Sequence, residues 1–323
     1  MNKALAIHLF CMLAAVGAMP AWSQTDYPSR PVRLIIPNAP GSSVDTIGRA
    51  LAVHMSTSLG QSVFAENRGG AAGMLGMEAG RLAPADGYTF IVASSSSMAA
   101  APLMKKAVAF DVLKDFDFVS SVALLPNVLA VNPALKISNV GELVVYARAN
   151  AGRVNMASAG IGSMSHLAGV NFSVAAGFES LHVPYTGGGQ SVGSVVAGQT
   201  QWTLTPAPAA MALVTAGRLK ALGHSMGREA RVLDGMPSLS EAVPGFEFNG
   251  WIGIVAPRDM PAPAVAKFRA ALTAAMRVPA LAATLSANGA IPHLTTPVEF
   301  RALLVRDIDA TRRTMRAAGI EPE

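Results

Sequence analysis

The sequence predicts an α/β protein of two lobes, and three observations support this fold class. Short β-branched runs alternate with longer segments whose apolar residues recur every three or four positions, which is typical of mixed, mostly parallel sheets flanked by helices. The length of 323 residues favours two domains over one. With 51% apolar and 14% charged residues, the chain can bury a large core.

The first 23 residues predict a signal peptide. Lys3 provides a positive start, residues 4–17 form an apolar stretch, and Ala21-Trp22-Ser23 offers small residues at a cleavage site. The stretch is shorter than the roughly 20 residues needed to span a bilayer, which disfavours an uncleaved anchor. The only cysteine, Cys11, follows Phe10 instead of a small residue, which disfavours a lipid anchor. We therefore expect cleavage after Ser23 and a periplasmic protein.

Composition excludes several function classes for the mature chain. Without Cys11 it has no thiol for a disulfide, a nucleophile or a metal site. Loss of Lys3 leaves a formal charge of 24 − 20 = +4, and no basic run interleaved with aromatic residues suggests nucleic-acid binding. The histidines show no metal-ligand spacing. We expect no metal, no cofactor, no nucleic-acid partner and a monomer.

The first lobe has three strand–loop–helix units, with strands expected at residues 32–36, 63–66 and 88–92. In open α/β folds such loops meet at the carboxyl edge of the sheet, where ligands bind. Asp45, three residues after Ser42, fits a helix-capping role as well as a ligand contact. The candidate ligand-binding residues of this lobe are Gly41, Ser42, Ser43, Asp45, Ser94 and Ser95.

The second lobe begins near Asn127 and has two glycine-rich loops, at residues 158–163 and 184–189, that each open a helix. Free N–H groups at helix starts bind anions, and glycine allows close backbone approach. Neither loop contains Arg or Lys, so a carboxylate there would be held by N–H groups, hydroxyls and water. His166 could face the anion or pack behind the loop. The candidates of this lobe are Ser158, Gly160, Gly162, Ser163, His166, Tyr185, Thr186, Gly187, Gly188 and Thr205.

Both ends of the mature chain are expected in the first lobe. The last helix has a core stripe of residues spaced three or four apart, at Phe300, Leu304, Ile308, Thr311 and Met315. We predict that the first lobe comprises residues 24–125 and 252–323. The second lobe then comprises residues 126–251, including the hinge crossings.

The ordered motifs of the mature chain resemble the Bug-type solute receptors of tripartite tricarboxylate transporters. The resemblance covers nearly all of the mature chain. It rests on Tyr27-Pro28-Ser29-Arg30-Pro31, Pro40-Gly41-Ser42-Ser43-Val44-Asp45 with Arg49, Glu66-Asn67-Arg68-Gly69-Gly70-Ala71, Pro84-Ala85-Asp86-Gly87-Tyr88-Thr89, Lys114-Asp115-Phe116, Ala157-Ser158-Ala159-Gly160-Ile161-Gly162-Ser163 with His166-Leu167, His182-Val183-Pro184-Tyr185-Thr186-Gly187 and Trp251-Ile252-Gly253.

The resemblance implies a type II periplasmic-binding-protein-like fold that closes on a small mono-, di- or tricarboxylate and delivers it to the membrane components of such a transporter. Two departures stand out. Ser42 replaces a glycine found in many relatives, and Thr205-Pro206 stands where many place an acid. Without an acid to pair with an ammonium group, plain carboxylates are the expected ligands.

Two other functions compete with the receptor interpretation. Gly223-His224-Ser225-Met226-Gly227 matches the G-x-S-x-G elbow of serine hydrolases, which would use Ser225, His293 and Asp234 or Asp259. That elbow needs a helix directly after the serine, and Gly235-Met236-Pro237 follows too soon. We therefore expect no enzymatic activity. A sensor-input protein that docks on a signalling kinase would use the same ligand-binding surface, and the sequence does not separate it from a transport receptor.

Overall fold

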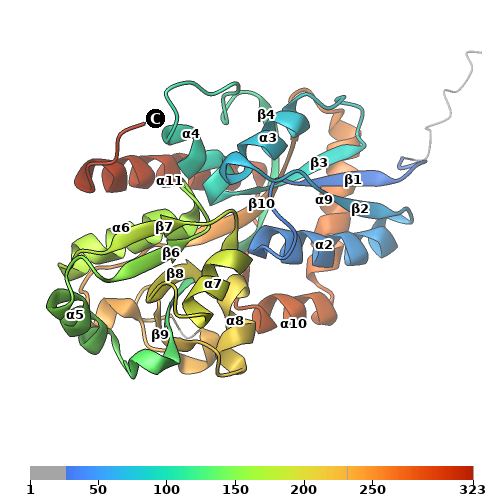
Figure 1. The fold of residues 1–323 in the computed structure, drawn as a ribbon. Coiled ribbons are helices and arrows are strands. Elements are labelled where there is room, and N and C mark those ends of the chain that lie inside the picture. Colours follow the sequence, from blue (N-terminus) through green and yellow to red (C-terminus); the bar gives the residue numbers. More distant parts are fainter. Residues whose placement is uncertain (1–26, 231, 323) are drawn as a thin grey trace, which may run out of the picture.

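A computed structural model describes residues 27–230 and 232–322 (Figure 1). The predicted signal peptide and its cleavage site lie outside the described residues. The described residues form two mixed sheets, one of six strands and one of five. In sheet order, the first consists of β11 (Ile291–Pro292), β4 (Phe116–Leu125), β10 (Gly250–Pro257), β3 (Thr89–Ser94), β1 (Val32–Ile36) and β2 (Val63–Asn67). In the same sense, the second consists of β7 (Leu181–Pro184), β6 (Asn155–Ser158), β8 (Trp202–Pro206), β5 (Asn127–Val131) and β9 (Lys220–His224).

Parallel pairing is less dominant than the sequence predicts. β1 pairs in parallel with β2 and β3, and β6 with β7 and β8, as expected for strand–helix–strand units. β10 instead runs antiparallel to both β3 and β4, and β5 runs antiparallel to both β8 and β9. The cause is the path of the chain: β4 continues through Pro126 into β5 of the other sheet, and β10 brings it back.

The helices cover both sheets, with shorter turns between them. They are α2 (Ser43–Leu59), α3 (Met74–Arg81), α4 (Ala101–Leu103), α5 (Val140–Ala149), α6 (Met164–Ala176), α7 (Gly188–Val196), α8 (Ala207–Thr215), α9 (Ala262–Met276), α10 (Pro279–Ala287) and α11 (Pro297–Ala317). The single-turn helices are η1 (Ala71–Gly73), η3 (Pro133–Leu135), η4 (Leu233–Gly235) and η5 (Leu239–Glu241), and η2 (Ser96–Ala100) is a π-type turn. In the described part of the chain, no single helix is long and apolar enough to cross a membrane, although the bent pair α9–α10 passes on length and composition.

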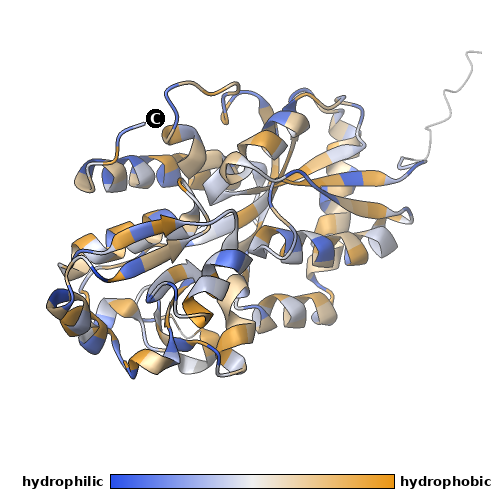
Figure 2. Cartoon of the chain, viewed as in Figure 1, coloured by the Kyte–Doolittle hydropathy of each residue, from blue (hydrophilic) through white to orange (hydrophobic). Residues whose placement is uncertain are grey.

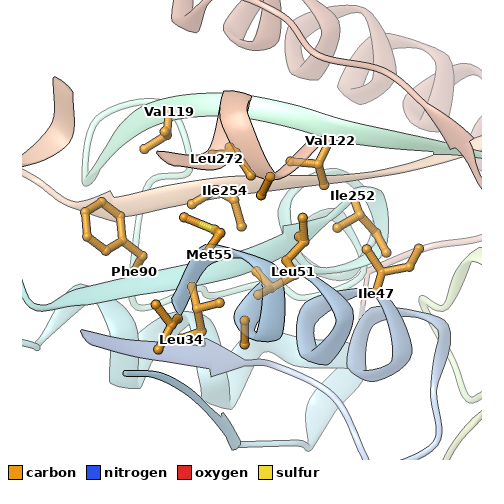
Figure 3. Packing of buried hydrophobic residues seen from close by; sticks show 14 of the residues in the cluster. Leu34, Ile47, Leu51, Met55, Phe90, Val119, Val122, Ile252, Ile254 and Leu272 are labelled. Atoms are coloured by element: carbon orange, nitrogen blue, oxygen red, sulfur yellow. The ribbon is translucent and has the colours of Figure 1, made fainter. Parts of the chain in front are cut away.

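One core cluster of the first sheet lies between the sheet and α2. Ile47, Leu51 and Met55 of α2 pack against Leu34 and Phe90 of the parallel strands (Figure 3). A second cluster on the opposite face contains Trp251 and Phe300. The five-stranded sheet has its own clusters on its two faces. Burial on both faces explains why the central strands read as continuous apolar runs.

Helix α11 packs beside both halves of the molecule, against β4 and α6. Hydrophilic and hydrophobic residues alternate along it (Figure 2), and its buried residues include every member of the predicted stripe. Met315 joins a cluster with Ala100, Met104 and Leu167. Asn171 of α6 donates a hydrogen bond to Thr314 Oγ1 over 3.0 Å. The C-terminal helix therefore packs against β4 of the first sheet and against α6, which covers the second sheet, and Figure 1 shows it above α6.

Candidate functional site

Loops from both sheets enclose a cavity of about 70 Å³, here called the inner cavity. No charged side chain of the described residues lines it. An outer cavity of about 400 Å³ adjoins it and shares Asn38, Ala72 and Ala159 with it. The inner cavity is lined by Asn38, Ser42, Ser43, Val44, Ala72, Ser94, Ser95, Ser96, Leu125, Ala159, Ser163, Met164, Ser165, Gly188, Thr205, Pro206, Ala209, Gly250 and Trp251.

The predicted residues fall into three groups. Seven line the inner cavity, namely Ser42, Ser43, Ser94, Ser95, Ser163, Gly188 and Thr205. Gly160, Tyr185 and Thr186 line the outer cavity. Gly41, Asp45, Ser158, Gly162, His166 and Gly187 line neither cavity.

Four helices begin at the wall of the inner cavity: α2, α6, α7 and α8. The first N–H groups of a helix have no intrahelical partners, and the helix dipole places partial positive charge at this end. Ser42 Oγ accepts from the Asp45 N–H and Ser163 Oγ from the His166 N–H, each over 3.2 Å, while α7 and α8 have no side-chain cap. The arrangement attracts an anion without a cationic side chain.

On the α2 side, Asp45 holds the loop in place. Its carboxylate accepts hydrogen bonds from the Gly41 N–H (2.9 Å), Arg49 Nε (2.8 Å) and Asn67 Nδ2 (2.8 Å). Arg49 also donates to Asn67 Oδ1. Because these protein donors occupy the carboxylate, the structure favours the structural role of Asp45 over a ligand contact.

On the α6 side, two stacked histidines support the glycine loop. The rings of His166 and His182 lie 4.1 Å apart at 20°. Gly162 N–H donates to His166 Nδ1 over 3.3 Å, and Ser158 Oγ lies 2.6 Å from His182 Nε2. Gly160 and Gly162 have φ of 111° and 75°, values that favour glycine.

Both imidazoles are held neutral. Burial, with His182 adding a smaller effect, lowers the pKa of His166 to about 4, and burial also lowers the pKa of His182. A neutral His166 ring can accept the Gly162 N–H at Nδ1, whereas a protonated ring cannot. His166 therefore packs behind the loop, which is the structural alternative that its sequence position left open.

Trp251 forms a wall of the inner cavity that the site prediction missed. Its indole Nε1 donates to Asp307 Oδ2 over 3.0 Å, and its ring packs edge-to-face on Phe300 at 5.0 Å. Burial raises the pKa of Asp307 to about 7, although the Trp251 hydrogen bond acts in the opposite direction. No glycine loop marks this position, because Trp251 lies in the strand β10. A search for loops at helix starts could not have found it.

Comparisons with known proteins agree with this architecture. Residues 47–318 match the family described as "Tripartite tricarboxylate transporter family receptor". The chain belongs to this family. It is 30% identical to BugT of Bordetella pertussis, over 99% of this chain and 98% of BugT. The predicted Bug-type resemblance is confirmed.

Solved structures give the same fold. A structure described as "R. palustris Rpa4515 with adipate" has a TM-score of 0.89 at 29% identity, covering 92% of this chain and 100% of the other. MatC of Rhodopseudomonas palustris, solved with malate, has a TM-score of 0.82 at 28% identity, covering 89% and 99%. The periplasmic binding protein BugD has a TM-score of 0.86 at 28% identity, covering 92% and 100%. The predicted periplasmic-binding-protein-like fold is thereby confirmed.

In this receptor, Ser225 does not have the surroundings of a hydrolase nucleophile. Its Oγ accepts from the Asn127 N–H and donates to Asn249 Oδ1, each over 2.8 Å. Turn and bend residues follow it instead of a helix. His293, the proposed base, instead has its Nδ1 2.9 Å from Ser121 Oγ. Ser225 therefore ties β5 to the segment before β10, and members of this family are solute receptors, not enzymes.

Proposed function

We propose that this receptor is periplasmic, binds a small carboxylate in the inner cavity, and delivers it to the membrane components of a tripartite tricarboxylate transporter. One observation carries the proposal: the N-termini of four helices, which pack on the two sheets, surround a cavity that no charged side chain of the described residues lines. Such a site suits a carboxylate, whose charge the N–H dipoles stabilise. Structural neighbours solved with adipate and malate support the ligand class.

The proposal includes a mature monomer that starts at Gln24. In it, residues 24–125 and 252–323 form one lobe and residues 126–251 the other. The residues that line the inner cavity hold the carboxylate directly or through water, and those of the outer cavity surround the rest of the ligand. Intact-mass measurement of periplasmic protein should give a chain beginning at Gln24. A chain that retains Met1 would contradict export with cleavage.

A thermal-shift screen tests the ligand class. Mature protein is mixed with mono-, di- and tricarboxylates, including adipate and malate, and with uncharged amides of the same skeletons as controls. A ligand at 100 times its Kd should stabilise the fold by about 2.7 kcal/mol, which raises the Tm by several degrees. If no carboxylate raises the Tm, or if the amides do so equally, the proposal is wrong.

A further inference from the structure

Two buried threonines of β8 differ in their hydrogen bonds and in their relation to the inner cavity. Thr203 and Thr205 are two residues apart, so their side chains lie on the same face of the strand. Their exposed fractions are 0% and 1%. Thr203 Oγ1 donates a hydrogen bond to the Ala157 carbonyl over 2.9 Å. Thr205 Oγ1 is buried without a hydrogen-bond partner among the described residues, and Thr205 lines the inner cavity.

A buried hydroxyl without a partner is rare because it loses the hydrogen bonds it would make with water. Nothing in the fold requires a hydroxyl here, since a valine has nearly the same shape and needs no partner. The position therefore costs stability in the ligand-free protein. A ligand group that pairs with Thr205 Oγ1 would recover that cost on binding.

The neighbouring backbone explains why a side chain supplies the donor at this corner. Pro206 and Pro208 have no N–H, and the Ala207 N–H is bonded to the Pro126 carbonyl over 2.9 Å. The start of α8 thus offers fewer free N–H groups than a helix start without prolines. The hydroxyl of Thr205, directly before it, can take their place.

The charge of the cavity decides which ligand atom Thr205 meets. A hydroxyl can donate or accept. Since four helix N-termini face the cavity and its lining has no carboxylate, an anionic oxygen is favoured and an ammonium group has no counter-charge. We propose that Thr205 determines ligand specificity by donating a hydrogen bond to a carboxylate oxygen of the ligand. This inference rests on the proposed function.

The test compares Thr205→Val, Thr205→Ser and Thr203→Val with the wild type, by calorimetric titration and by Tm without ligand. The probes are adipate, malate and aspartate, which has an ammonium group where malate has a hydroxyl. Thr205→Val should weaken the binding of adipate or malate by about tenfold or more, and Thr205→Ser should restore it. The wild type should prefer malate to aspartate.

The Tm without ligand distinguishes a role of Thr205 in binding the ligand from a role in stabilising the fold. Thr205→Val should leave it unchanged or raise it, whereas Thr203→Val should lower it by a few degrees with affinity retained, because the Ala157 carbonyl loses its partner. The inference is overturned if Thr205→Val binds as tightly as the wild type, lowers the Tm as much as Thr203→Val, or if aspartate binds better than malate. If the wild type binds no carboxylate of the full panel, the proposed function itself fails.

Discussion

The two loops that face each other across the inner cavity are stabilised by different chemistry. The α2-side loop depends on an ion pair, in which Asp45 binds the backbone of Gly41 and the side chains of Arg49 and Asn67. The α6-side loop depends on neutral groups, the stacked His166 and His182. In both cases the supporting side chains lie behind the loop and line neither cavity.

This difference shows how a cavity can attract an anion without holding a charged side chain. The charge of Asp45 is balanced by Arg49, whose Nε lies 2.8 Å away, and the histidines carry none at neutral pH. Within the lining of the inner cavity, the helix starts therefore supply the positive potential. Changes of charge on the two sides of the inner cavity should therefore have different effects on carboxylate affinity and on the free energy of unfolding.

A new charge at the start of α7, in the lining of the inner cavity, should have the largest effect on carboxylate affinity. Gly188→Asp places a carboxylate in the lining, and like charges across a binding surface cost several kcal/mol. Carboxylate affinity should fall by about 100-fold or more, measured by titration calorimetry. A Cβ at Gly188 would lie 3.4 Å from the Ala209 Cβ, a contact that the fold can accommodate.

Gly189→Asp is the matched control. Gly189 is exposed, a Cβ there meets nothing within 4 Å, and it does not line the cavity. The carboxylate affinity of Gly189→Asp should stay close to that of the wild type. Equal loss in both variants would show that charge near the start of α7 acts in general, and the cavity assignment would then be wrong.

Removing the charge of Asp45, behind the α2-side loop, should have the next largest effect, and this effect is on stability. Asp45→Ala leaves the Gly41 N–H and Asn67 without their acceptor and Arg49 without its partner, which should lower the free energy of unfolding by about 2–4 kcal/mol. Urea denaturation measures this change. Asp309→Ala, which breaks an exposed 3.5 Å pair with Arg312, should cost less than about 0.5 kcal/mol. Similar losses in the two variants would contradict the role given to Asp45.

The neutral α6 side should be sensitive to acid. The pKa of His166 is lowered to about 4 in the folded protein against 6.5 when unfolded, so the unfolded chain binds more protons between these values. The contribution of the neutral His166 to the free energy of unfolding is therefore fully present above pH 6.5. It is lost as the pH falls toward 4, with a loss of about 2 kcal/mol at pH 5. Urea denaturation across this range should show a weaker pH dependence for His166→Asn. An unchanged slope in that variant would exclude His166 as the source.

A site away from both loops should have the smallest effect on binding. Ser225→Ala removes two hydrogen bonds at the junction of the sheets and should cost about 1–2 kcal/mol of stability while carboxylate affinity stays within about twofold. An ester-hydrolysis assay on wild type and variant completes the comparison. Hydrolysis by the wild type that disappears in Ser225→Ala would restore the hydrolase interpretation.

Local features of the site were predictable from the sequence. The buried stripe of the last helix and the cap of α2 by Ser42 depend on neighbours within a turn or two. Phe246 and Phe248, ahead of β10, pack into a core cluster without pairing in the sheet, and β10 begins only at Gly250. An apolar pattern indicates burial, but it does not show whether a segment pairs in a sheet.

The sequence alone therefore determined the family, the export signal to be tested and the glycine loops expected to bind an anion. Tertiary structure decided which residues meet: His166 with His182, Trp251 with Asp307, and Thr205 with the cavity instead of a carbonyl. It also showed that Ser225 Oγ pairs with the Asn127 N–H and with Asn249 Oδ1 instead of an imidazole, whatever its motif suggests. The physical reason is that periodicity and capping depend on residues close in the chain. Contacts across 16 or 56 positions depend on how the sheets and helices pack.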